Sequence, residues 1–119
     1  EGVPVVYDGV GKDTFMGSLD SLGVRGMLVT FGNASGAVPP FDPLLLTQKG
    51  SLFITRPKLA DYTAKRDDLL ELGGELFDVV TSGKVRIEVN QTYALADAAL
   101  AHRDLEARKT TGSTVFLPR

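Results

Sequence analysis

The stretch VPVVYDGVG at residues 3–11 decides the fold. Val3–Tyr7 is a short apolar run rich in β-branched residues, which predicts a strand buried on both faces, and the glycines after it end that strand. Similar buried strands are predicted at Met27–Phe31 and at Ser51–Thr55, where Arg56-Pro57 stops the third strand. The first part of the chain is therefore organised around three short buried strands.

Helical patterns separate these strands. Asp13 or Thr14 can cap a helix that runs to about Leu22, where Gly23 and Gly26 end it. Asp42-Pro43 starts a second, short helix. Four further elements are predicted after the third strand: a helix over Leu59–Ser82 that is weakened at Gly73-Gly74, a half-exposed strand at Val85–Val89, an Ala-rich helix over Ala96–Arg108, and a closing strand at Ser113–Leu117.

The alternation of strands and helices indicates an α/β fold with a parallel sheet and right-handed crossovers. Three such strands with their helices make about half of a doubly wound nucleotide-binding domain. The glycine fingerprint of the other half is absent, since Gly9-Val10-Gly11 is followed by Thr14 where the third glycine should fall. No Walker-type Gly-Lys-Ser/Thr sequence occurs either.

Composition excludes several classes of protein. The chain has 119 residues and a net charge of −2, with 43% hydrophobic and 24% charged residues, which is typical of one globular domain. No apolar run is long enough for a transmembrane helix, and the mild acidity argues against a nucleic-acid-binding protein. Zero cysteines and a single histidine, His102, disfavour a zinc site and a serine-type triad.

The first residues bear on whether the chain has a signal peptide and how its N-terminus arises. No basic segment followed by an apolar one is visible, so we expect no signal peptide and a cytoplasmic location. The chain enters a strand almost at once, without an initiator methionine. Both a processed N-terminus and a piece of a longer protein fit this beginning.

Candidate binding residues lie at the strand ends, because ligands of open parallel sheets bind outside the carboxyl ends of the strands. These ends are 8–11, 31–35 and 55–57. Small residues in the first two segments let a flat ligand approach the backbone closely, although ordinary turns have the same composition.

Other residues are ambiguous by the same reasoning. Asp8 is either catalytic or, as strand-end carboxylates more often are, bound to the start of the following helix. His102 is expected at the surface. Arg108, with Lys109, is typical of favourable pairing with a helix dipole, and Arg86 is expected to be solvated.

Three segments with the spacing of a known family narrow these alternatives. VVYDGVG at 5–11, FGNASG at 31–36 and QKGSL at 48–52 followed by Thr55-Arg56-Pro57 resemble the bacterial quinone oxidoreductases, which are zeta-crystallin-like, zinc-free members of the medium-chain dehydrogenase/reductase superfamily. The tail, from Tyr93 through Ala101-His102 to Thr111-Gly112-Ser113, is similar to the C-terminal end of that family. The resemblance covers essentially the whole chain.

The resemblance implies that the chain is a C-terminal fragment, because family members are much longer. Residues 1–83 would be the C-terminal half of the NADP-binding Rossmann-type domain. Residues 84–119 would be a terminal strand-helix-strand segment that packs back on an absent catalytic domain. The function implied is NADPH-dependent reduction of a quinone without a metal, and the fragment alone is expected to be inactive.

The resemblance also implies roles for individual residues. Gly9, Val10 and Gly11 would lie near the nicotinamide end of NADPH, Phe31, Gly32, Asn33 and Ala34 would line the nicotinamide and its carboxamide, Thr55, Arg56 and Pro57 would contact the cofactor further along, and Arg108 would reach it from the C-terminus. None of these side chains is an acid or base suited to the reaction, so no catalytic residue is assigned.

Two alternatives stay open. In the first alternative, the parent protein would be a different zinc-free reductase of the superfamily, such as an enoyl reductase. In the second, the chain would be a non-catalytic dimerisation module. The family dimerises through the edge strand, so a homodimer through Ser51–Thr55 is expected.

Overall fold

The computed structural model describes residues 1–118, which fall into two compact units, unit 1 (Glu1–Arg66) and unit 2 (from Asp67 onward). The expected division lay between residues 83 and 84. In the structure the long helix α4 (Arg66–Thr81) belongs almost entirely to unit 2. The assignment of 1–83 and 84–119 to two family segments stays a prediction. None of the described helices is long and apolar enough to cross a membrane.

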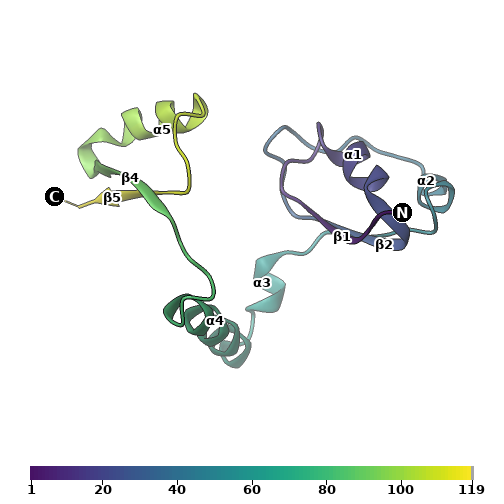
Figure 1. Cartoon of the computed structure of the whole chain (residues 1–119), viewed down its shortest axis with the longest axis horizontal. Helices are drawn as coiled ribbons and strands as arrows, with labels where there is room; N and C mark the ends of the chain where they lie inside the picture. The colour runs from purple at the N-terminus through teal and green to yellow at the C-terminus, as the bar shows by residue number, and fades with distance from the viewer. Residues whose placement is uncertain (119) are drawn as a thin grey trace. The chain divides into compact units, whose positions relative to one another are not determined.

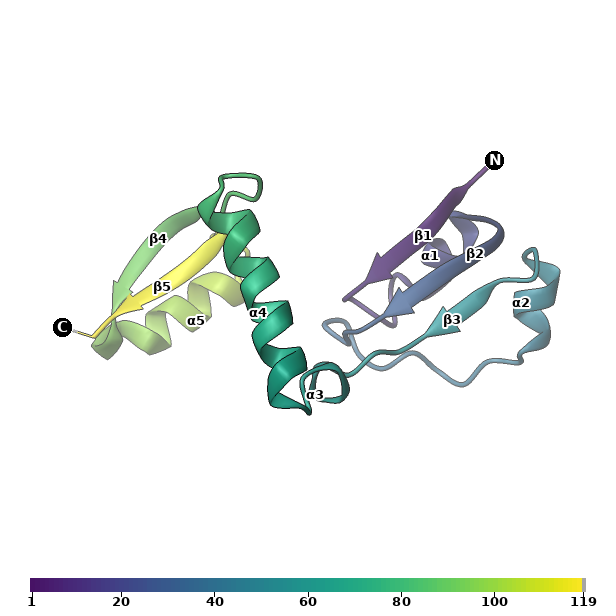
Figure 2. The same ribbon diagram turned by 90° about the horizontal axis from the view of Figure 1, so that it is seen from below.

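Unit 1 is built on a parallel sheet in the order β1-β2-β3. Its strands are β1 (Val3–Asp8), β2 (Leu22–Thr30) and β3 (Phe53–Thr55), and they run in the same direction (Figure 2). The crossovers contain the short helices α1 (Phe15–Asp20) and α2 (Leu44–Gln48), and α3 (Leu59–Tyr62) follows β3. The predicted three parallel strands are therefore confirmed, and their carboxyl ends share one edge.

The core of unit 1 lies between the sheet and its crossovers (Figure 1). Five apolar residues are buried there: Phe15, Leu19, Leu22, Leu28 and Leu52. Removing these side chains from water supplies most of the stabilisation of such a unit, at about 1.5–3 kcal/mol for each large side chain.

The prediction of buried strands is wrong for β3, where Phe53 is 55% exposed, and the prediction of burial on both faces is wrong for β1. Val6 packs against the core, but Val5 is 40% exposed and Tyr7 73%. Alternate side chains of a strand point to opposite faces. Within the described part of unit 1, α1 and α2 contribute core residues only on the face that Val6 shares with Leu28.

The second strand also begins earlier than predicted. Gly23 and Gly26 lie inside β2 rather than at the end of α1, which stops at Asp20. Between the pairs Val3↔Leu22 and Val5↔Met27 the register shifts, so β2 bulges. Arg25 adopts φ +60° in this bulge, and its N–H donates to the Gly50 carbonyl (2.8 Å). A bulge of this kind could not be recognised from apolar periodicity.

The third strand is shorter than predicted, because Ser51 has a left-handed backbone with φ +56° and cannot continue it. The predicted helix over Leu59–Ser82 is divided into α3 and α4. The Thr63 hydroxyl donates to the Leu59 carbonyl (3.1 Å) and ends α3. Gly73-Gly74 stay within α4, where neither glycine has a close neighbour.

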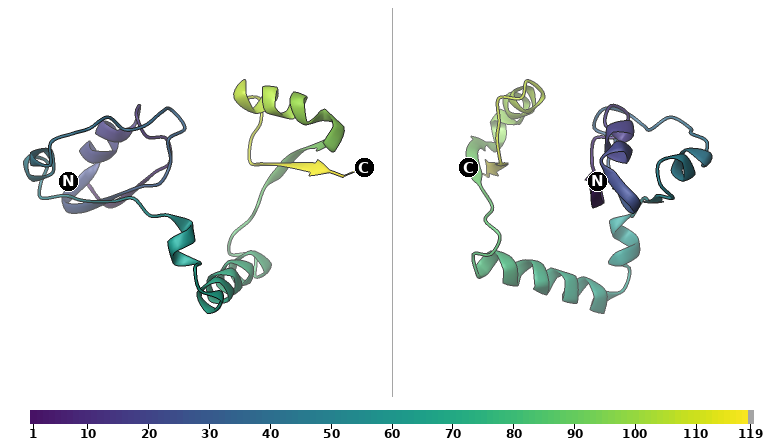
Figure 3. Two further views of the ribbon diagram at one scale, coloured as in Figure 1. Left: turned by 180° about the vertical axis from the view of Figure 1, so that it is seen from behind. Right: turned by 45° about the vertical axis from the view of Figure 1, so that its right-hand side comes forward.

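Unit 2 contains α4 and a two-stranded parallel pair. β4 (Val89–Ala94) pairs with β5 (Ser113–Leu117), and the short η1 (Leu95–Asp97) leads into α5 (Ala98–Glu106). Figure 3 shows α5 beside this pair. The closing strand is confirmed at its predicted bounds, and α5 corresponds to the predicted Ala-rich helix.

The prediction of a strand at Val85–Val89 is wrong, since the strand starts at Val89 and ends at Ala94. Tyr93 stacks with Phe116 at a centroid distance of 6.4 Å, and the Gln91 amide donates to Thr114 (2.7 Å). These cross-strand contacts select the later register. The Arg86 guanidinium lies 2.8 Å from the Glu88 carboxylate, and both side chains are exposed to solvent, as expected.

Candidate functional site

The loops that follow β1 and β2 meet at the carboxyl-end edge of unit 1. The Phe31 N–H donates to the Asp8 carbonyl (2.9 Å), the Ser35 N–H donates to the Val10 carbonyl (2.9 Å), and the Lys12 N–H donates to the Gly36 carbonyl (3.1 Å). These bonds bring together two of the three strand ends that the sequence offers as candidate binding segments. We call the segments 9–13 and 31–36 the first and second edge loops.

Two glycines permit this close approach. A Cβ atom on Gly32 would lie 2.1 Å from the carbonyl oxygen of Gly9, so no other residue fits at position 32 without a backbone shift. Gly11 has φ +91°, a conformation that favours glycine. Glycine in these loops therefore serves the packing of one loop on the other, in addition to any ligand.

The Asp8 carboxylate accepts hydrogen bonds from both the first edge loop and the start of α1. Its side chain is buried (4% exposed) and accepts hydrogen bonds from the N–H groups of Val10 and Gly11 and from the hydroxyls of Thr14 and Ser18, at 2.7–3.0 Å. Burial alone would raise the pKa of Asp8. The hydrogen bonds, led by that from Gly11, outweigh burial and lower the pKa to about 2. A buried carboxylate with this many donors is ionised and organises structure, which favours the helix-binding alternative over a catalytic one.

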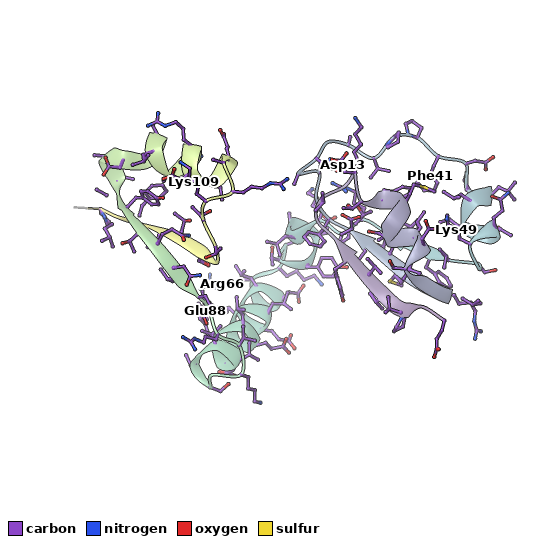
Figure 4. All side chains as sticks on the ribbon, turned by 45° about the horizontal axis from the view of Figure 1, so that its top comes forward. Asp13, Phe41, Lys49, Arg66, Glu88 and Lys109 are labelled. Atoms are coloured by element: carbon purple, nitrogen blue, oxygen red, sulfur yellow. The ribbon has the colours of Figure 1, made fainter. Side chains whose placement is uncertain are left out.

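Ser35 joins the two edge loops through its side chain. Its hydroxyl oxygen accepts from the Asp13 N–H (3.0 Å) and donates to the Val10 carbonyl (2.9 Å). Figure 4 labels Asp13 at this edge. Ser35 could not be predicted as a link between the loops, because no local pattern identifies a contact between residues 25 positions apart in the chain.

A cleft of about 670 Å³ opens beside the second edge loop, within unit 1. The predicted residues Asn33, Thr55 and Arg56 line it together, and the Arg56 guanidinium donates to the Thr30 hydroxyl (3.2 Å). The other lining residues are mostly apolar: Phe15, Ala37, Val38, Pro39, Pro40, Phe41 and Ile54. The Phe41 ring, labelled in Figure 4, lies 5.0 Å from that of Phe15. The cleft therefore has a mostly apolar wall that also carries the Asn33 amide and the Arg56 guanidinium.

The remaining predicted residues lie outside the cleft wall. Gly9, Val10 and Gly11 form the first edge loop, and Phe31, 55% exposed, begins the second. Ala34 is exposed and Pro57 half-buried.

Arg108 belongs to unit 2, where it follows Ala107, the C-cap residue of α5, with φ +57°. Its N–H donates to the Leu105 carbonyl (3.0 Å). Next to it, Asp104 accepts from the Tyr93 hydroxyl (3.0 Å) and from the ammonium of Lys109 (3.2 Å), the residue labelled in Figure 4. The bond from Tyr93 lowers the pKa of Asp104 and raises that of Tyr93. His102 is exposed on α5, as expected.

No group of three or more acidic or histidine side chains within residues 1–118 is arranged to hold a metal ion.

Known proteins resemble the whole chain. Residues 1–116 match the zinc-binding dehydrogenase family. A quinone oxidoreductase of Pseudomonas aeruginosa is 55% identical over 97% of the chain, and a 2-haloacrylate reductase of a Burkholderia species is 45% identical over 100%. The chain spans 35% and 36% of the lengths of these two relatives.

Solved structures share this fold. A mycobacterial protein complexed with NADPH superposes with a TM-score of 0.92 at 52% identity, and the Escherichia coli quinone oxidoreductase complexed with NADPH with 0.90 at 48%. Each match covers 98% of this chain and 36% of the other. The resemblance to quinone oxidoreductases and the predicted Rossmann-type α/β fold are confirmed. The chain belongs to the zinc-binding dehydrogenase family.

Proposed function

We propose that this chain is the C-terminal part of a cytoplasmic NADPH-dependent quinone oxidoreductase, which transfers reducing equivalents from the nicotinamide to a quinone. The observation that carries the proposal is the edge of unit 1, where two glycine loops meet beside an apolar cleft. Solved relatives of the same fold, with TM-scores of 0.92 and 0.90, are complexes with NADPH. The residues of this edge suit a flat cofactor, because bare backbone permits close approach.

In this proposal the chain orients the cofactor and the cofactor carries the reaction. Gly9–Gly11 and Phe31–Ala34 lie along the nicotinamide, and Thr55–Pro57 contact the cofactor further along. Arg108 is proposed as a further residue that contacts the cofactor. The N–H groups of Val10 and Gly11 are already bound to Asp8 (2.8 and 3.0 Å). They are not free for a phosphate, so the pyrophosphate is held elsewhere in the parent protein.

Asn33 is proposed to bind the nicotinamide carboxamide. Its side chain lines the cleft and, within residues 1–118, makes no hydrogen bond to the protein. An amide can both donate to and accept from a carboxamide. Losing one such bond costs about 0.5–3 kcal/mol, so Asn33→Ala should weaken NADPH binding roughly 2- to 100-fold.

A matched variant separates this role from a turn role. Asn33→Gly keeps the backbone freedom that a turn requires but deletes the amide. Fluorescence titration should show both variants weakened. Binding of NADPH by Asn33→Gly at the wild-type affinity would mean that Asn33 is a turn residue only.

Turnover of NADPH and a quinone tests the proposed function. The full-length protein that contains this chain should be active, whereas the purified 119-residue chain should show no turnover, since it supplies no cradle for the pyrophosphate. Robust activity of the 119-residue chain would refute the fragment proposal, and an inactive full-length protein would refute the quinone reductase.

A second candidate is reduction of a carbon–carbon double bond. It is favoured by the 45% identity to a protein named 2-haloacrylate reductase. The full-length protein should be assayed with NADPH against both a benzoquinone and 2-chloroacrylate. The substrate with the higher kcat/KM decides between the two reductases.

The parent enzyme is further proposed to be a homodimer through the edge strand at Ser51–Thr55. Strand β3 is last in the sheet order of unit 1, and Phe53 on it is 55% exposed. Phe53→Lys should lower the dimer fraction measured by sedimentation, whereas Leu59→Lys, at a site 77% exposed outside the strand, should not. An unchanged dimer mass in Phe53→Lys would place the interface elsewhere or leave the strand unpaired.

A further inference from the structure

The Ser35 hydroxyl joins the second edge loop of unit 1 to the first. It is half-buried between the edge loops and makes one hydrogen bond in each direction, accepting at 3.0 Å from Asp13 N–H and donating at 2.9 Å to the Val10 carbonyl. Among the described residues, it is the one side chain of the second edge loop that hydrogen-bonds to the first. Within residues 1–118 the other hydrogen bonds between these loops join backbone atoms.

We propose that Ser35 is a positioning residue for the nicotinamide end of the cofactor. The inference rests on the proposed function, in which the two edge loops lie along the nicotinamide. Ser35 itself need not touch the cofactor. Its hydroxyl adds two side-chain bonds to the backbone bonds that fix the separation of Val10 from the Gly32-Asn33 segment, and so helps to hold both loops against one flat ring.

The geometry explains why a hydroxyl is required. The Val10 carbonyl also accepts from the Ser35 N–H (2.9 Å), so backbone and side chain of Ser35 converge on the same oxygen. Asp13 stands just before the start of α1, and its N–H has the Ser35 oxygen as acceptor. Removing the hydroxyl leaves the Asp13 N–H without this acceptor and leaves the Val10 carbonyl with the Ser35 N–H alone. The loops then lose the side-chain bonds that join them, while the fold is retained.

Ser18 supplies a matched control. Its hydroxyl is half-buried and donates to the Asp8 carboxylate (2.7 Å), and it comes from α1 rather than from an edge loop. Ser35→Ala and Ser18→Ala therefore delete the same group from the same neighbourhood. Only Ser35→Ala removes the side-chain hydrogen bonds between the loops, while the backbone bonds between them remain.

The experiment uses the full-length protein and measures NADPH affinity by fluorescence titration, kcat and KM for NADPH, and the melting temperature. Ser35→Ala should raise both Kd and KM for NADPH by about 2- to 12-fold, with kcat at saturating NADPH nearly unchanged. Ser18→Ala should lower the melting temperature at least as much but leave Kd unchanged. Ser35→Thr, which retains the hydroxyl, should restore the wild-type Kd.

Equal Kd values for wild type, Ser35→Ala and Ser18→Ala would overturn the role of Ser35 while leaving the proposed function intact. A wild-type protein that does not bind NADPH would overturn both. Should Ser35→Ala not fold, Ser35→Cys takes its place with the same expectation, because a thiol keeps the volume but forms weak hydrogen bonds.

Discussion

Asp8 in unit 1 and Asp104 in unit 2 each hold a turn that contains a proposed cofactor residue, but they do so differently. Asp8 is 4% exposed and is surrounded by neutral backbone and hydroxyl donors. The Asp104 side chain is 19% exposed, and its partners are the Tyr93 hydroxyl and the Lys109 ammonium. The pKa of both carboxyls is lowered, by hydrogen bonds that outweigh burial at Asp8 and chiefly by the bond from Tyr93 at Asp104.

The difference shows where each turn gets its rigidity. Loss of the Asp8 charge would leave the buried Gly11 N–H and three part-buried donors with a weaker acceptor, which is costly where water replaces it poorly. Water and salt can replace the Lys109 ammonium, whose side chain is 69% exposed, as a partner of Asp104. The first edge loop is therefore fixed by a buried charge, whereas the turn at Arg108 is held by interactions that open easily.

The largest expected effect comes from neutralising the two carboxylates in turn. Asp8→Asn should lower the free energy of unfolding by about 1.5–3 kcal/mol, the value of hydrogen bonds to a charged group. Asp104→Asn should lower it much less. Urea unfolding of the full-length protein at pH 7 checks this, and equal losses in the two variants would abolish the distinction between the units.

Acid offers an independent measure of the same charge. The pKa of Asp8 is lowered from 3.8 to about 2 in the folded state, so the stabilisation is complete above pH ~4 and is lost as the pH falls through about 2. The loss should be on the order of 2 kcal/mol. Asp8→Asn should remove this part of the pH dependence. A variant with the wild-type acid profile would show that Asp8 does not titrate below its ordinary range.

A smaller effect is expected from adding a methyl group at the contact between the edge loops. Gly32→Ala would place Cβ 2.1 Å from the Gly9 carbonyl and should cost about 1–3 kcal/mol. Gly17→Ala in α1, where no atom lies within 4 Å, should instead stabilise by roughly 0.5–1 kcal/mol. If thermal melts show both alanines to be neutral, the edge loops are not tightly packed.

The smallest effect is expected in unit 2. Lys109→Ala removes the exposed ion pair to Asp104 and should change the melting temperature little, with any change vanishing at high salt. Tyr93→Phe removes the other bond to Asp104 (3.0 Å), and its effect should persist in salt. A large, salt-resistant loss in Lys109→Ala would contradict the view that this turn is weakly held.

The sequence predicts those features that depend on local pattern or on a general rule of parallel sheets. Ser113–Leu117 is a strand as its pattern indicates, and the segments after β1 and β2 meet because parallel strands end at one edge. The early start of β2 was missed because it depends on the left-handed backbone of Arg25. The alternation at Val85–Val89 is equally good for a strand, but the pairing of Tyr93 with Phe116 selects Val89–Ala94.

The residues of the candidate site likewise include some that the sequence predicts and some that it does not. Small residues at a strand end identified the edge loops, and the resemblance to a known family identified Asn33 and Arg56, which share one cleft. The role of Ser35 could not be predicted, because its hydroxyl bonds to Val10, 25 residues away in the sequence. Which donors a strand-end carboxylate such as Asp8 collects is likewise decided by tertiary packing.

Hydrogen exchange tests most directly the claim that the edge loops of unit 1 hold the nicotinamide end of NADPH. Within residues 1–118 the N–H groups of Gly32 and Asn33 have no protein acceptor, whereas Ser35 N–H is bound to Val10 (2.9 Å). When NADPH is added to the full-length protein, exchange at Gly32 and Asn33 should slow markedly, with no change at Val85–Val89. Saturating NADPH that leaves exchange at Gly32 and Asn33 unaltered would contradict the account.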